Sequence, residues 1–213
     1  MPSRLPETPD SLDAVLTVSR ETKERLSVYV ELVRKWQRSQ NLIAPGTVER
    51  IWTRHVADSA QALAALPEAR RWADLGSGAG FPGLVTAICL AGAPGAHVHL
   101  VESNRGKASF LRTVIRETGA PASVHAERIE GFTATFAEPV DAVSARALAP
   151  LADLCRLAEP LSRRGAALVF HKGQDFASEL AEATQSWVLD LVEHPSRIDP
   201  GGRIVVIRSL RPR

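Results

Sequence analysis

The stretch from Asp74 to Gly83 restricts the fold of this chain more than any other segment. It reads DLGSGAGFPG, follows the short apolar run 71–75 and precedes the apolar, helix-like run 84–91. Glycine costs backbone entropy on folding, so four glycines within eight positions indicate a tight turn against a neighbouring group. That group could be a phosphate, a nucleoside or only the next helix.

Strand-like and helix-like segments alternate after residue 70. We predict strands at 71–75, 96–102, 122–127, 140–146 and 165–172, with 187–194 and 202–209 as a closing antiparallel pair. The alternation predicts an α/β fold with a mostly parallel, doubly wound, Rossmann-like sheet. Ligands of such sheets bind at the carboxyl ends of the strands near the switch point, which is where the glycine turn is expected.

The first part of the chain has the apolar spacing of helices rather than of strands. Apolar residues recur at three- and four-residue steps from Leu26 to Trp36, and a second helix is predicted from Val48 to Leu66. We therefore predict an N-terminal helical subdomain, 1–66, followed by the α/β domain, 67–213.

The composition of the chain indicates its cellular compartment and which binding partners are compatible with its charge. Apolar residues make up 45% of the 213 residues, and no run approaches the roughly 18 apolar residues of a membrane span. The first ten residues are polar and proline-marked, so we expect no secretory signal. Cys89 and Cys155 are far apart, which favours reduced thiols in a cytoplasmic protein. A formal charge of +2 permits an RNA partner without arguing for one.

Two ligands compete for the glycine turn. The segment 78–83 satisfies G-x-G-x-x-G, and Glu102 follows about 20 residues later, as in a dinucleotide site. However, Asp74 precedes the glycines, and a carboxylate there repels a diphosphate and suits a cation. S-adenosylmethionine carries a sulfonium and an ammonium group and no phosphate. A methyltransferase, an NAD-dependent dehydrogenase and a binding module without turnover all remain open, as does packing of helix against sheet.

Other strand ends supply candidate contacts to the same ligand. Glu102, at the end of the second strand, is placed to take the ribose hydroxyls. Ile129 and Glu130 follow the third strand and are placed to meet an adenine. Arg146 ends the fourth strand and begins the loop that faces the transferable methyl group.

The loop after Arg146 limits the methyl acceptor. Its sequence lacks the Asn/Asp-Pro-Pro-aromatic run of enzymes that methylate exocyclic amines, and neither cysteine lies in a loop that suits attack on a pyrimidine carbon. An acceptor with its own lone pair remains, such as guanine N7. No proton leaves N7 on methylation, so placement alone drives the step and we predict no catalytic acid or base.

Several motifs occur in the order found in one known family. They are WQRSQNLI, RHVADS, DLGSGAGFPG, VESNRGKASFLRTV, ERIEGF, DAVSARALAPL and HKGQ. Together they resemble the small-subunit (16S) rRNA guanine-N7 methyltransferases, also called glucose-inhibited division protein B, over roughly residues 26–208. This chain has Ile43, Ala145 and His171 where family members often or sometimes have threonine, serine and leucine.

The resemblance implies a specific reaction. It is methyl transfer from S-adenosylmethionine to N7 of guanine 527, in the 530 loop of bacterial 16S rRNA. The resemblance also implies which residues contact the cofactor. They are Gly76, Gly78, Phe81, Glu102, Ile129, Glu130 and Arg146.

Scattered basic residues are the candidates for RNA contact. We expect Arg54, His55, Arg105 and Lys172 to converge around the strand ends, where a guanine splayed out of its loop must enter. Because net charge is low, affinity for naked RNA should be modest, so we expect a small-subunit particle as substrate. We also expect the enzyme to be a monomer. His55, Asp58 and Ser59 share one helix face, as an anchor to the site or as a buried polar network.

The remaining histidines give no indication of a metal. His97, His99, His125 and His194 lie in strand-like segments without metal-ligand spacing, so we expect no metal ion.

Overall fold

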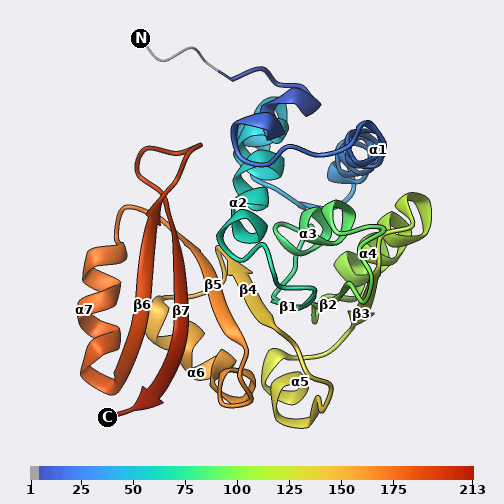
Figure 1. Ribbon diagram of the computed structural model, residues 1–213. Coiled ribbons are helices and arrows are strands. Elements are labelled where there is room, and N and C mark those ends of the chain that lie inside the picture. Colours follow the sequence, from blue (N-terminus) through green and yellow to red (C-terminus); the bar gives the residue numbers. More distant parts are fainter. Residues whose placement is uncertain (1–4) are drawn as a thin grey trace.

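The computed structural model describes residues 5–213; residues 1–4, the start of the predicted helical subdomain, lie outside the described residues. A seven-stranded sheet runs through the molecule in the order β3-β2-β1-β4-β5-β7-β6 (Figure 1). Its strands are β1 (Arg71–Leu75), β2 (His97–Val101), β3 (Ala122–His125), β4 (Ala142–Arg146), β5 (Ala167–Lys172), β6 (Trp187–Pro195) and β7 (Arg203–Pro212). β1 to β5 are parallel, and β7 runs antiparallel to β5 and β6. The predicted α/β fold is confirmed.

Helices cover both faces of the sheet. They are α1 (Arg20–Gln37), α2 (Asp58–Ala65), α3 (Gly83–Cys89), α4 (Arg105–Thr118), α5 (Ile129–Thr135), α6 (Leu151–Ser162) and α7 (Phe176–Ser186). Three short turns precede α1 or α2: the 3-10 helices η1 (Pro9–Ala14) and η2 (Pro45–Arg50) and the π-helical η3 (Trp52–Ala57). Every helix among residues 5–213 is too short or too polar to span a bilayer.

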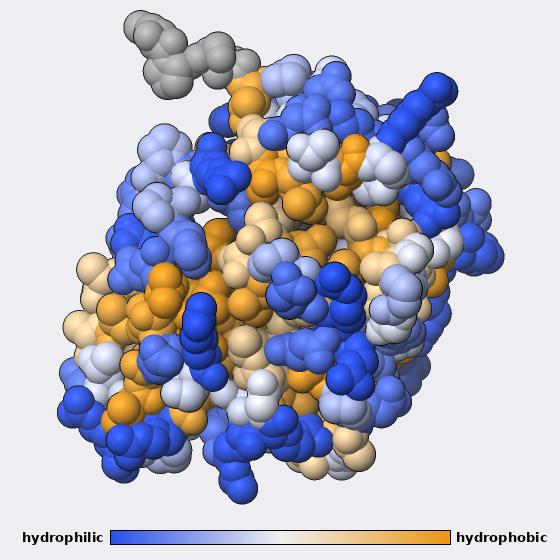
Figure 2. Space-filling model, in the orientation of Figure 1, coloured by the Kyte–Doolittle hydropathy of each residue, from blue (hydrophilic) through white to orange (hydrophobic). Residues whose placement is uncertain are grey.

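The central strands β1, β2, β4 and β5 are largely buried on both sides, which explains their nearly continuous apolar sequence. Trp72 and Val169 face the apolar cluster beneath α1 to α4. Their neighbours Ala73 and Leu168 face the cluster beneath α5 to α7, because successive side chains alternate across a strand. Figure 2 shows apolar residues over β5, β6 and β7 and also around the N-terminal helices, with hydrophilic residues between and around them.

The N-terminal helices share their core with the sheet. Leu26, Tyr29 and Val33 are fully buried, as the three- and four-residue spacing predicted, and belong to the same apolar cluster as Trp72 of β1. Ser19 caps α1 by accepting a hydrogen bond from the Thr22 amide at 3.1 Å. The division at residue 66 into subdomain and domain remains a prediction.

The predicted helix from Val48 to Leu66 is interrupted. The chain forms η2, then the π-helical turn η3, and only then α2. The prediction of one regular helix was wrong because apolar spacing does not distinguish a π-helical turn from an α-helical one. The interruption matters because π-helical turns free backbone groups for other partners.

Candidate active site at the switch point

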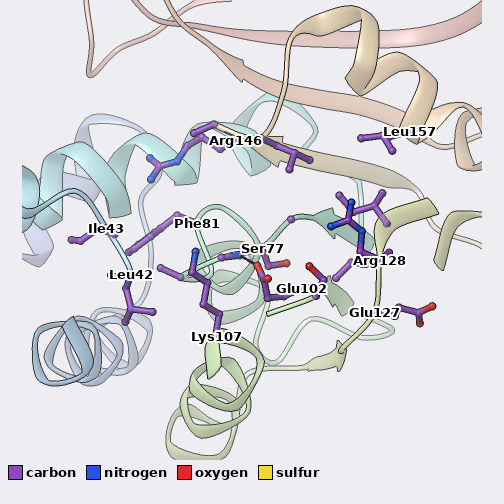
Figure 3. Close-up of a pocket in the computed structure, with 18 of the residues that line it drawn as sticks. Leu42, Ile43, Ser77, Phe81, Glu102, Lys107, Glu127, Arg128, Arg146 and Leu157 are labelled. Carbon is purple, nitrogen blue, oxygen red and sulfur yellow. Dashed lines mark hydrogen bonds between the residues drawn. The ribbon is translucent and has the colours of Figure 1, made fainter. Parts of the chain in front are cut away.

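A cavity of about 580 Å³ opens at the carboxyl ends of β1 to β4, where the strand order reverses (Figure 3). Its lining includes every cofactor contact that the sequence predicted: Gly76, Gly78, Phe81, Glu102, Ile129, Glu130 and Arg146. In Figure 3, Arg146 and Phe81 lie on one side of the cavity, and Glu102, Glu127 and Arg128 on the other. The volume is in the range of small-molecule sites.

Left-handed backbone conformations shape the glycine turn. Gly76, Gly78 and Gly80 have φ values of 65°, 56° and 96°, which glycine adopts without steric cost. A Cβ at Gly76 would lie 2.7 Å from Leu148 Cδ1, so the Leu148 side chain would have to shift to admit it. The turn therefore brings bare backbone to the cavity wall.

Glu102 holds the turn in place. Its Oε2 accepts a hydrogen bond from the Gly78 amide at 2.9 Å, and its Oε1 accepts one from the Asn104 amide at 2.7 Å. The side chain is buried at the wall of the cavity. Because each carboxylate oxygen has a further lone pair, Glu102 can position the turn and also accept a ligand hydroxyl.

Asp74 does not occupy the place that the electrostatic argument gave it. Its side chain is 1% exposed and lies outside the cavity lining. Ser144 Oγ donates to its Oδ1 at 2.6 Å, and Oδ2 lies beside Gly83 without a well-formed hydrogen bond among the described residues. Burial raises the pKa of Asp74 from 3.8 to about 6. The expected attraction between Asp74 and a cationic ligand was wrong, because strand alternation turns this carboxylate into the protein interior.

Arg146 joins the end of β4 to the N-terminal helices. Its Nη1 donates to the Arg54 carbonyl oxygen at 3.0 Å and to Asp58 Oδ2 at 2.9 Å, and its Nη2 donates to His55 Nδ1 at 2.6 Å. The guanidinium also lies 5.4 Å from the centre of the Phe81 ring. One side chain thus connects η3, α2 and the glycine turn.

The hydrogen bonds around His55 fix its tautomer. Nδ1 accepts from Arg146, so Nε2 carries the proton and donates to Thr47 Oγ1 at 2.7 Å. Thr47 in turn donates to the Ala44 carbonyl at 2.7 Å. Burial, with the nearby charges of Arg146 and Arg54, lowers the pKa of His55 to about 3. His55 is therefore neutral at physiological pH.

A second cavity, of about 540 Å³, adjoins the first. The two share four lining residues: His55, Arg146, Ala147 and Leu148. The rest of the second cavity is lined by residues of η2, η3, α2, α6 and α7, by Ala149 and Pro150, by the end of β5 with Gly173, and by Asp199. The two compartments meet at the four common residues, which we call the shared wall.

The four predicted RNA contacts do not all converge. Arg54, His55 and Lys172 line the second cavity. Arg105 lies exposed at the start of α4 and is absent from the described lining of both cavities. Arg54 is paired with Asp199 at 2.5 Å, and Lys172 is buried against Glu179 and donates to the Ala149 carbonyl at 3.1 Å. Neither cation is thus a free phosphate contact.

Several site residues escaped sequence analysis. Tyr29, Thr47, Glu179 and Asp199 lie far from the glycine turn in sequence and in no recognisable motif. Asp58 was noted only as part of a helix face. That face forms a buried polar network with Arg146, to which both His55 and Asp58 bind, and Ser59 is fully buried.

Three of the four remaining histidines gather on β2 and β3, away from the two cavities, while His194 lies on β6 at the other edge of the sheet. His99 Nδ1 lies 3.1 Å from His125 Nε2, and His97 Nε2 lies 3.0 Å from Ser123 Oγ. Across residues 5–213, the histidine, cysteine and acidic side chains form no group arranged to hold a metal ion. That this protein uses no metal remains a prediction.

The fold and the position of the cavity define a class of protein. The strand order, the glycine turn after β1 and the cavity at the switch point are those of Rossmann-like, class I methyltransferases. The O-methyltransferase TomG of Streptomyces achromogenes, solved in complex with S-adenosylmethionine, superposes with a TM-score of 0.60 at 15% identity, covering 94% of this chain and 95% of that one.

Sequence comparison identifies the family. The family described as rRNA small subunit methyltransferase G (GidB) matches residues 22–199. The ribosomal RNA small subunit methyltransferase G of Parvibaculum lavamentivorans is 51% identical over 202 residues, or 94% of this chain and 89% of that protein. The protein of the same name from Bradyrhizobium sp. (strain ORS 278) is 49% identical over 200 residues, covering 94% and 90%. The chain belongs to the GidB family, and the resemblance seen in its motifs is confirmed.

Proposed function

We propose that this protein transfers a methyl group from S-adenosylmethionine to N7 of guanine 527 in bacterial 16S rRNA. The observation that carries the proposal is the pair of adjoining cavities in a chain of the GidB family, with Arg146 and His55 in the shared wall. One cavity suits the methyl donor and the other the acceptor. The enzyme acts as a monomer on a small-subunit particle in the cytoplasm.

The first cavity fits S-adenosylmethionine. Its lining holds three carboxylates, those of Glu102, Glu127 and Glu130, and three cations, so it has acceptors for the ammonium and hydroxyl groups of the ligand and a cation for its carboxylate. The bare backbone from Gly76 to Gly78 can approach the methionine part closely. Glu102 would accept from the ribose hydroxyls, and Ile129 and Glu130 would contact the adenine. Bound there, S-adenosylmethionine supplies an electrophilic methyl group.

The residues of the chain position the reactants and exclude water. Guanine N7 attacks with its own lone pair, so the enzyme has no proton to remove. Consistent with this, His55 is locked in a neutral tautomer between Arg146 and Thr47, and its low pKa makes it unsuited to act as a base near neutral pH. We therefore assign no catalytic acid or base.

Methylation of small ribosomal subunits tests the proposal. Subunits from a strain that lacks this protein are incubated with the enzyme and S-adenosylmethionine, and the rRNA is digested and mapped by mass spectrometry. We expect N7-methylguanosine at one position, which is unmodified in the deletion strain. Identical guanine modification with and without the gene would refute the proposal. Equal methylation of an isolated loop oligonucleotide would refute the particle as substrate.

A ligand titration separates the methyltransferase from the dehydrogenase alternative. S-adenosylmethionine should raise the melting temperature of the protein, and NAD should not, because ligands stabilise the folded state they bind. A shift with NAD alone would favour an oxidoreductase.

A further inference from the structure

The charged side chains that line the second cavity are all paired with one another. They form three ion pairs: Arg54 with Asp199, Arg146 with Asp58, and Lys172 with Glu179. Three cations and three anions leave this lining without net charge. A phosphate or a carboxylate would therefore gain little from entering, whereas a neutral ligand with hydrogen-bonding edges would find both donors and acceptors.

The two histidines that line the second cavity do not change its net charge. His55 is neutral for the reasons given above, and burial also lowers the pKa of His171. His171 donates from Nε2 to the Asp58 carbonyl at 2.9 Å, and its buried Nδ1 has no acceptor among the described residues, as expected for the neutral imidazole. The lining thus suits a neutral heterocycle such as a purine base.

The shared wall sets the orientation of a guanine in this cavity. Its N7 must face the methyl donor where the two cavities meet, beside His55, Arg146 and the 147–148 backbone. The exocyclic N2 amino group is the guanine donor farthest from N7, at the opposite end of the ring system. It must therefore point away from the first cavity, toward residues that line the second cavity alone.

Three carboxylates line the second cavity alone, those of Asp58, Glu179 and Asp199, and one of them has an oxygen that accepts from no donor among the described residues. Asp58 accepts from Arg146 on one oxygen and from Gln61 on the other, and Asp199 accepts from Arg54 and from a backbone amide. Glu179 accepts only through Oε2, from Lys172 and from the Leu151 amide. Among residues 5–213, no donor reaches Glu179 Oε1.

We propose that Glu179 Oε1 accepts a hydrogen bond from the N2 amino group of the target guanine. This inference rests on the proposed function and names the residue that selects the base. Methyl transfer to N7 places positive charge on the purine, which makes the N2–H a stronger donor. The bond to the carboxylate therefore strengthens as the methyl group moves, and it should act on kcat more than on KM.

Two substrates and one variant test this contact. Small subunits are reconstituted from 16S rRNA with either guanosine or inosine at the target position, because inosine keeps N7 and lacks only the N2 amino group. Wild-type enzyme should methylate inosine roughly 10- to 100-fold more slowly, as expected for loss of a hydrogen bond to a charged group. Glu179→Gln should slow methylation of guanosine by a similar factor, mainly in kcat, and should slow inosine no further.

Controls separate recognition from folding. Glu182→Gln changes an exposed glutamate on the same helix, outside both cavities, and should react like wild type. Titration calorimetry should show the same affinity of Glu179→Gln and wild type for S-adenosylmethionine.

Two results would overturn the inference while leaving the proposed function intact. One is equal rates of wild-type enzyme on guanosine and inosine, a result that needs no variant to fold. The other is an unchanged guanosine-to-inosine ratio in Glu179→Gln, which would show that Glu179 only supports Lys172 and the start of α6. Absence of N7-methylguanosine with wild type and guanosine subunits would instead refute the proposed function itself.

Discussion

Tyr29 Oη donates a 2.7 Å hydrogen bond to the carbonyl oxygen of Ala79. The bond joins the middle of α1 to the glycine turn at the wall of the first cavity. Both groups are buried, and the Tyr29 ring also packs against Phe81 with ring centres 5.1 Å apart. The N-terminal helices thus support the turn directly.

Tyr29→Phe should loosen this support. The variant keeps the ring contacts and leaves the Ala79 carbonyl without its donor, which should lower the free energy of unfolding by about 1–3 kcal/mol. Affinity for S-adenosylmethionine should also fall, because the turn lines its cavity. Urea unfolding and titration calorimetry measure the two effects. Val28→Ala, at an exposed position on the same helix, is the control and should change neither.

Gly76→Ala should strain the turn and crowd Leu148. The left-handed φ of 65° costs a non-glycine residue about 1–2 kcal/mol, and the new Cβ would approach Leu148 Cδ1 to 2.7 Å. We expect S-adenosylmethionine affinity to fall at least about tenfold, and Gly76→Asp to abolish methylation. Gly95→Ala is the matched control, since Gly95 has a φ of 73° with nothing within 4 Å of its Cβ. Equal cofactor affinity in both alanine variants would contradict the role of Gly76.

Arg146→Lys should fail to replace arginine. A single ammonium group cannot reach the Arg54 carbonyl, Asp58 and His55 at once, because only the guanidinium presents several donors in a rigid plane. We expect loss of most activity in Arg146→Lys and of all activity in Arg146→Ala, with destabilisation of about 2 kcal/mol in the latter.

A double-mutant cycle that combines Arg146→Ala with Asp58→Asn tests whether the hydrogen bond between the two side chains stabilises the protein. A coupling free energy of about 1–3 kcal/mol is expected for groups in one hydrogen-bond network. If the effects of the two substitutions on the free energy of unfolding are additive, the ion pair between Arg146 and Asp58 contributes little to stability, as exposed ion pairs do.

Asp74→Asn should change how stability depends on pH. The folded-state pKa of about 6 lies above the ordinary 3.8, so the folded state binds this proton more tightly than the unfolded chain does. Asp74 therefore destabilises the fold progressively as pH rises from about 4 to about 6, and the penalty is complete above that range. Asparagine keeps an acceptor for Ser144 and does not ionise. Relative to wild type, it should gain up to roughly 3 kcal/mol by pH 7.

Urea unfolding at several pH values between pH 4 and pH 8 measures this difference. The gap between Asp74→Asn and wild type should widen with rising pH and level off above pH 6. A gap that stays constant with pH would show that Asp74 titrates normally in the folded protein.

Local sequence determined much of the fold because its signals lie within a few residues of one another. The end of α4 at Gly119, for example, follows from a glycine in the left-handed conformation, with φ 64°. The same holds for the glycine turn, whose residues line the first cavity as expected. The π-helical turn at Trp52–Ala57 was missed, because its apolar spacing is that of an ordinary helix.

The sequence by itself determined the alternating strands, the position of the glycine turn and the family, since each rests on short-range pattern or on ordered motifs. Only the tertiary structure decided which charges meet. It turned Asp74 into the interior, paired Lys172 with Glu179, and placed Arg54 against Asp199, 145 residues away in sequence. Such pairings depend on how strands alternate and on which loops come together at the sheet edge, and no local pattern of residues encodes them.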